Sequence, residues 1–157
     1  MGDRMIATRA LDLPARRGSG YPAPHDVPCR ERVRHTLGDV FGLTQFGVNL
    51  LELAPGAWSS QRHWHERQDE FVYVLEGEAT LVTDDGETVL SAGMVAGFKA
   101  ASGNGHHIVN RSNAVVRLLE VGTRTAEETA TYSDIDMMYR EDATVEGYFT
   151  KDGRPLK

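Results

Sequence analysis

Between residues 31 and 122 the chain alternates short apolar runs with turn residues. The runs recur roughly every 8–12 residues and are separated by Gly, Asp and Pro, as in all-β sandwiches and barrels. Asp84-Asp85-Gly86 is a strong hairpin signal, and no long segment before Gly122 has helical periodicity. The predicted strands are Arg32–Leu37, Thr44–Leu53, Trp58–His65, Phe71–Leu75, Ala79–Thr83, Glu87–Leu90, Val95–Phe98, His106–Asn110 and Ala114–Val121.

The segments on either side of this central region differ from it in composition. Residues 1–30 hold four of the six prolines together with Gly18 and Gly20, which predicts an irregular N-terminal arm. Residues 123–157 are polar and acidic but carry too many Tyr, Met and Phe side chains for a free tail. We therefore divide the chain into an arm (1–30), a barrel (31–122) and a C-terminal tail (123–157). The tail is expected to pack on the barrel or a partner subunit, with a short helical turn at Ala126–Thr131.

Composition narrows the class of protein. The 157 residues, 40% hydrophobic and 25% charged, fit one globular domain with a real core. A net charge of −6 and a pI near 5.5 argue against nucleic acid as the main partner. The single cysteine, Cys29, excludes an internal disulfide framework, and no apolar run approaches the length of a membrane span. We expect a cytoplasmic protein with no membrane partner.

Candidate chemistry is concentrated in His63-Trp64-His65 and Glu70. Alternate side chains of a strand share a face, so His63 and His65 point the same way. Glu70 has the opposite parity and can join them only if the polar segment Glu66–Asp69 bends. Two imidazoles and a carboxylate would then form a mixed site of the kind that holds Fe, Mn, Ni, Cu or Zn.

Strand parity also assigns the neighbouring side chains. If His63 and His65 face inward, Ser59 and Gln61 share their face and line the cavity. The opposite face of the following strand then carries three large apolar side chains: Phe71, Tyr73 and Leu75. Because such a group is not expected to stay bare, we predict that the arm, the tail or a partner subunit covers it.

The histidine region resembles the first of the two motifs of the cupin superfamily. That motif has a glycine, then HxH, then a glutamate, then a second glycine. It is matched here by Gly56, His63, His65, Glu70 and Gly77. The segment between Gly56 and His63 is one residue longer than in the usual pattern.

A later segment resembles the second cupin motif, GxxHxxxN. It is matched by Gly103, His106 and Asn110. The chain departs from the pattern where proline is usual, because Lys99 or Ala101 stands there. The loop before His106 is also longer than usual. Together the two motifs and their spacer cover residues 56–110.

The resemblance implies an all-β double-stranded β-helix, a jelly-roll-like barrel. It also implies one divalent metal ion (Zn, Mn, Fe or Ni) held by His63, His65, Glu70 and His106. His107 is the alternative to His106, but it would face the other way in a strand, so we favour His106. Three imidazoles and one carboxylate leave about two positions open on an octahedral ion, as in catalytic sites.

Some of these residues also have simpler structural explanations than a role in a metal site. Glu70 could pair with Arg62 or Arg67 instead of a metal. Asn110 is better explained as a turn residue, and Lys99 could reach an anionic substrate at the barrel mouth. Trp58 is expected to pack in the core.

The segments 105–112, 119–124 and 132–136 resemble those of single-domain cupins labelled sugar phosphate isomerases. A metal-dependent isomerase acting on a small polar substrate is therefore our first hypothesis, although no second carboxylate for a base is evident. An Fe(II)-dependent dioxygenase and a non-catalytic module that binds a small ligand or metal are the alternatives. We expect a homodimer with a small-molecule ligand.

Overall fold

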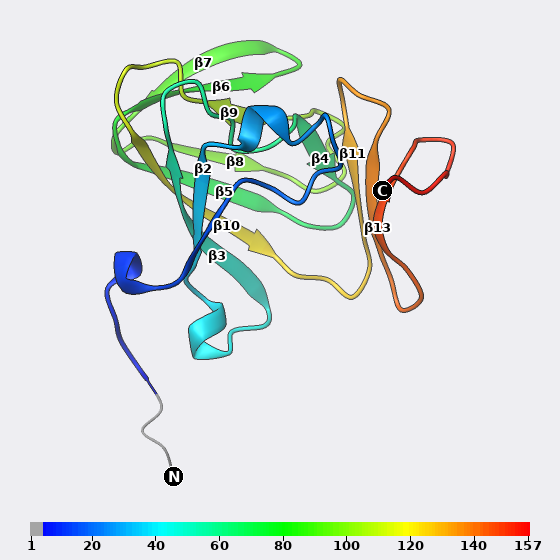
Figure 1. Ribbon diagram of the computed structural model, residues 1–157, viewed down its shortest axis with the longest axis horizontal. Helices are drawn as coiled ribbons and strands as arrows, with labels where there is room; N and C mark the ends of the chain where they lie inside the picture. Colours follow the sequence, from blue (N-terminus) through cyan, green and yellow to red (C-terminus); the bar gives the residue numbers. More distant parts are fainter. Residues whose placement is uncertain (1–4) are drawn as a thin grey trace.

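The computed structural model describes residues 5–157, which form short strands, turns and three 3₁₀ helices (Figure 1). None of the helices in this range is long and apolar enough to cross a bilayer. The 3₁₀ helices are η1 (Ala10–Asp12), η2 (Val27–Cys29) and η3 (Asp39–Phe41). The strands are β1 (Ala15–Arg17), β2 (Arg32–Thr36), β3 (Phe46–Leu53), β4 (His63–His65), β5 (Glu70–Glu76), β6 (Glu78–Thr83), β7 (Gly86–Ser91), β8 (Val95–Phe98), β9 (His107–Val109), β10 (Val116–Thr123), β11 (Glu128–Tyr132), β12 (Met138–Glu141) and β13 (Glu146–Phe149).

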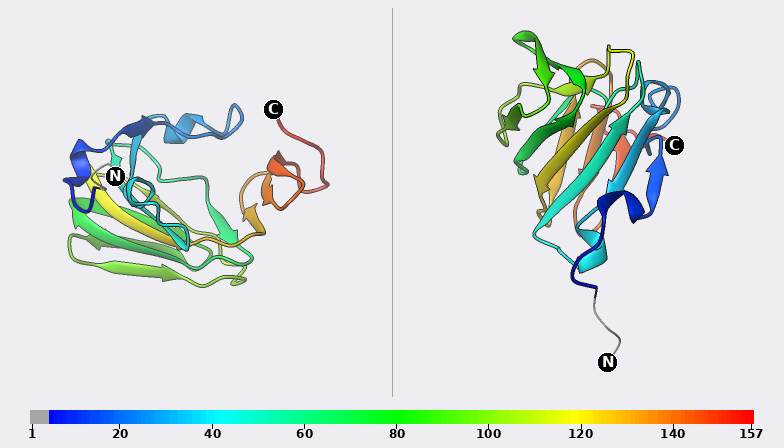
Figure 2. Two further views of the ribbon diagram at one scale, coloured as in Figure 1. Left: turned by 90° about the horizontal axis from the view of Figure 1, so that it is seen from below. Right: turned by 90° about the vertical axis from the view of Figure 1, so that its left-hand side faces the viewer.

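These strands pair into antiparallel sheets that curl around a common interior. The largest sheet has the order β1-β2-β3-β10-β5-β8, the second β13-β12-β11-β4 and the third β7-β6-β9. Isolated bridges between Trp58 and Val109 and between His63 and His106 join the segment that contains β4 to the β9 segment. Figure 2 shows the blue arm along one side of the barrel and the orange and red C-terminal strands at one end.

The interior of the large sheet is apolar at one end and polar at the other. Leu118 of β10 lies between Leu51 of β3 and Val74 of β5, and all three are almost fully buried. Two residues further along β10, Glu120 lies opposite Asn49 on the same face. Every second side chain of a strand points to the same face, so these residues all face the interior. The apolar layer therefore fills one end of the barrel, and polar side chains line the other end.

The strand predicted at Trp58–His65 is shorter than expected, because only His63–His65 is extended. Side chains from the arm and β2 bind the backbone just before it. The Arg32 guanidinium donates to the carbonyl of Ser59 (2.6 Å), and the N–H of Gln61 donates to the Tyr21 hydroxyl (3.3 Å). These backbone groups are therefore satisfied without a neighbouring strand.

The predicted helical turn at Ala126–Thr131 is wrong, since Glu128–Tyr132 forms β11. Buried and half-buried residues alternate along this segment, which is the period of a strand. β11 pairs with β4, placing Ala130 opposite His65 and Tyr132 opposite His63. The C-terminal segment thus fixes the strand that carries both histidines.

The outer face of β5 is apolar and open in this chain. Phe71, Tyr73 and Leu75 are 41%, 36% and 47% exposed, so neither the arm nor the tail covers them. A homodimer in which a partner subunit covers this face stays a prediction.

Candidate metal centre

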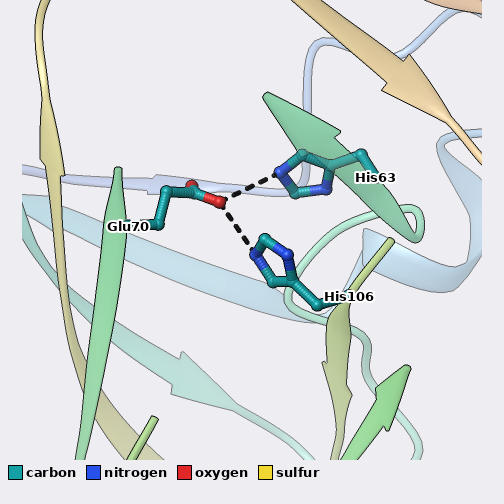
Figure 3. Close-up of side chains that lie close together, drawn as sticks. All are labelled: His63, Glu70 and His106. Atoms are coloured by element: carbon teal, nitrogen blue, oxygen red, sulfur yellow. Dashed lines mark ion pairs between the residues drawn. The ribbon is translucent and has the colours of Figure 1, made fainter. Parts of the chain in front are cut away.

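Three of the candidate side chains converge from separate segments. His63 lies on β4, Glu70 begins β5 and His106 immediately precedes β9. One potential ligand atom of each lies within 4.8 Å of the others (Figure 3). The two histidines are tied together through their backbones: the N–H of His63 donates to the carbonyl of His106 (3.1 Å), and the reverse bond is 2.8 Å long.

Glu70 is the point on which the imidazoles converge. Its Oε2 lies 2.8 Å from Nε2 of His106 and 3.5 Å from Nε2 of His63. Its Oε1 lies 3.4 Å from Nε2 of His65, which brings the fourth predicted residue to the cluster. The irregular segment 66–69 between β4 and β5 supplies the bend that parity required of Glu70. The same nitrogen of each ring therefore faces one carboxylate.

The surroundings of the rings leave these nitrogens available. Nδ1 of His63 lies 2.8 Å from the carbonyl of Gln61 and donates to it, so Nε2 is the nitrogen that faces Glu70. The ring of His106 is stacked on Phe98, with centroids 3.5 Å apart and planes 2° from parallel. The hydrogen bond to Gln61 orients the ring of His63, and the stacking on Phe98 fixes the plane of the ring of His106.

Burial and charge act against each other on these groups. Burial raises the pKa of Glu70, but the imidazoles of His106, His63 and His65 that face it outweigh burial and hold this pKa well below its ordinary value. Burial lowers the pKa of His63, yet Glu70 outweighs it and the pKa is raised. For His106 burial prevails and the pKa is lowered. One carboxylate thus faces several imidazoles that cannot all be charged together.

The donor set fits a divalent metal ion. Oε2 of Glu70 is buried, and within residues 5–157 it has no hydrogen bond of acceptable geometry, although Nε2 of His106 lies 2.8 Å away. Buried polar atoms are rarely left in this condition unless an ion or a water completes them. Imidazole and carboxylate are ligands for Zn, Mn, Fe and Ni.

A further carboxylate, that of Glu128 on β11, lies behind His65. Its side chain is 2% exposed, and its Oε1 accepts hydrogen bonds from the N–H groups of Glu66, Arg67 and Thr129 (3.0, 3.2 and 2.8 Å). Its Oε2 lies 3.9 Å from Nδ1 of His65. A carboxylate in this position favours a proton on Nδ1, which leaves Nε2 as the ligand atom. Sequence reasoning missed Glu128, whose one signal is an acid at a buried position of an alternating segment.

The cluster lies in the wall of a cavity of about 420 Å³, a size typical of small-ligand sites. Ser59 lines this cavity as predicted. The prediction for Gln61 is wrong, because its amide turns to the arm and donates to the carbonyl of His25 (2.8 Å). His107 points away from the cluster: its ring packs edge-on against Trp58, with ring centroids 4.6 Å apart. Trp58 itself is half-buried and lies outside the core cluster, so the core packing predicted for it is wrong.

Comparison with known proteins decides the family. The cupin domain family matches residues 49–122. A sugar phosphate isomerase from a cupin superfamily of Silicibacter pomeroyi DSS-3 is 49% identical over 96% of this chain and 97% of that chain, with a TM-score of 0.90. The chain belongs to the cupin superfamily. The family and the all-β jelly-roll fold predicted from the sequence are therefore confirmed.

Two more distant structures resemble this cupin. A protein from Acidithiobacillus ferrooxidans that carries the provisional name sugar phosphate isomerase is 28% identical over 80% of this chain and 81% of that chain, with a TM-score of 0.72. The polyketide cyclase RemF from Streptomyces resistomycificus is 23% identical over 76% and 79%, with a TM-score of 0.63, and shares the fold alone. No curated protein matches the chain.

The cavity of this cupin contains a second carboxylate that sequence reasoning did not find. Glu120 of β10 lines it together with Glu70. The Asn49 amide donates to Oε1 of Glu120 (3.1 Å), and a guanidinium nitrogen of Arg34 lies 3.2 Å from the same oxygen. The available signal was parity, because Glu120 shares a strand face with the buried Leu118.

Proposed function

We propose that this cupin is a metal-dependent isomerase acting on a small phosphorylated sugar. The observation that carries the proposal is that the His/Glu cluster and Glu120 face one cavity of substrate size. The isomerase name of the relative that is 49% identical supports the reaction class. Fold alone would not, since one fold hosts many activities.

His63, His65, Glu70 and His106 would hold the metal, a divalent ion of the Zn, Mn, Fe or Ni type. When bound, such an ion supplies a Lewis acid that polarises the carbonyl and hydroxyl oxygens of the substrate. Glu70 is committed to the metal, and its pKa, held down by its three histidine partners despite burial, keeps it ionised for that task. A separate group must therefore move the proton.

Glu120 is placed to move that proton. In an aldose–ketose isomerisation a base removes the proton from the carbon that bears the hydroxyl group and returns it to the neighbouring carbonyl carbon. The carboxylate of Glu120 takes this proton and gives it to the neighbouring carbon, while the hydroxyl proton passes to the former carbonyl oxygen, so atoms and charge balance over the cycle. Asn49 and Arg34 fix Oε1 of Glu120, which leaves Oε2 to reach the substrate.

The test is turnover of candidate sugar phosphates in D₂O by protein loaded in turn with Zn, Mn, Fe(II) or Ni. We expect NMR to show interconversion of one aldose–ketose pair, with deuterium entering the carbon at which the proton is exchanged. Absence of interconversion and exchange with every metal would refute the isomerase. Oxygen consumption by the Fe(II) form in place of isomerisation would favour the dioxygenase alternative.

Replacing Glu128 with Gln is expected to weaken metal binding by about 10–100-fold, the range typical of groups that orient a metal-bound histidine. The amide oxygen can still accept the three backbone hydrogen bonds, but the charge behind His65 is lost. Competition with a chelator measures the affinity. Glu127→Gln is the matched control, because Glu127 is an exposed neighbour. Equal affinities for the two variants would contradict the orienting role of Glu128.

A further inference from the structure

We infer that Arg16, Arg32 and Arg34 form a phosphate subsite in the cavity and hold the phosphate monoester of the substrate. This inference rests on the proposed function and specifies its substrate. The arginines line the same cavity as the metal centre. They lie on one face of the β1–β2 pair, because Arg16 is directly opposite Arg34 and Arg32 precedes Arg34 by two residues.

This arrangement is costly for the protein alone. Like charges directly opposite each other on neighbouring strands are destabilising. Arg32 is only 5% exposed, so its charge is largely removed from water. Burial and the nearby Arg34 both lower the pKa of Arg32. Burial raises the pKa of Tyr148, another residue of the cavity wall, and the charges of Arg32, Arg34 and Arg16 each act to lower it.

The carboxylates of the cavity do not balance these charges. Its acidic lining residues within the described chain are Glu70, which belongs to the metal cluster, and Glu120, which pairs with Arg34. Arg32 donates to the carbonyl groups of Gly18 and Ser59, which carry no net charge.

The arginines of the cavity wall differ in whether a carboxylate neutralises them. Within residues 5–157 Arg16 has no carboxylate within ion-pair distance, and Nε of Arg34 is buried without a hydrogen-bond partner. Arg124, which also lines the cavity, is by contrast engaged by Asp39 (2.9 Å). A chain with a net charge of −6 therefore concentrates unpaired positive charge in one wall of its cavity.

A phosphate monoester is the ligand that this wall fits. It brings close to two negative charges and three acceptor oxygens, and guanidinium forks bind such oxygens in pairs. Binding there would neutralise the opposed Arg16 and Arg34 and satisfy the buried Nε of Arg34. The phosphate would anchor one end of the sugar while the carbons to be isomerised lie at the metal cluster and Glu120.

The first experiment measures binding of inorganic phosphate to the purified protein by calorimetry. We expect Arg16→Gln and Arg34→Gln each to weaken binding about tenfold or more, and the double variant to weaken it further. Arg17→Gln is the matched control. It removes the same charge from the same strand as Arg16, but its side chain alternates to the other face and pairs with Glu31. Equal effects of the Arg17 and Arg34 changes would overturn the subsite.

Two further measurements distinguish phosphate bound by the arginines from phosphate bound at the metal centre. Glu70→Gln is expected to keep phosphate binding, and loss of binding in this variant but not in the arginine variants would place the anion at the metal and overturn the inference. A sugar phosphate is expected to displace inorganic phosphate, whereas the sugar without phosphate is not. Displacement by both alike would also overturn it.

A second substitution of Arg34 separates a loss of affinity from a loss of folding. Arg34→Lys retains the charge without the guanidinium fork and is expected to recover part of the affinity that Arg34→Gln loses, with an unchanged circular dichroism spectrum. Failure of recovery in a folded Arg34→Lys protein would count against a charge-based subsite. Because none of these measurements needs turnover, phosphate binding without isomerisation would refute the proposed reaction and leave the subsite standing.

Discussion

Glu70→Gln is expected to lower the affinity for divalent metal more than 100-fold, beyond the range of about 10–100-fold for groups that act through a ligand. Glu70 is the one carboxylate that the three imidazoles share, with Oε2 2.8 Å from His106 and Oε1 3.4 Å from His65. The neutral amide removes the negative charge on which all of them converge. Metal content after purification and competition with a chelator both measure the loss.

His107→Ala is the control for this prediction. His107 is adjacent to a candidate ligand in sequence, yet its Nδ1 lies 3.0 Å from the carbonyl of Ser60 and its ring packs on Trp58. We expect this variant to keep its metal while losing some stability. Retention of metal by Glu70→Gln, or its loss from His107→Ala alone, would show that the ligand set is misassigned.

The part of the site that the sequence predicts is the part that depends on local geometry. The alternation of side chains along a strand places His63 and His65 together, and the polar segment after them allows the bend that turns Glu70 toward them. The predicted hairpin at Asp84-Asp85-Gly86 likewise joins β6 to β7, with Asp84 and Asp85 in the turn and Gly86 as the first residue of β7. Each of these inferences needs only residues within a few positions of one another.

The rest depends on which strands become neighbours, and no local pattern contains that information. Glu120 reaches the cavity because β10 pairs with both β3 and β5, which are distant in sequence. Glu128 lies behind His65 because β11 pairs with β4. The same pairing explains the wrong helical turn at Ala126–Thr131: the segment becomes a strand by supplying hydrogen bonds to β4, a tertiary effect that overrides weak local preference.

Glu120→Gln is expected to reduce kcat by about 10²–10⁴-fold, the usual contribution of a positioned general base, with metal content unchanged. The amide oxygen can still accept from Asn49 and Arg34, so the substitution removes the base and keeps its position. Incorporation of deuterium from D₂O should fall together with turnover, because both need the same proton transfer. Glu76→Gln is the control, since Glu76 lies on the same sheet but is exposed and pairs with Arg117. Wild-type exchange in a metal-loaded Glu120→Gln protein would assign the proton transfer to another group and remove Glu120 from the reaction.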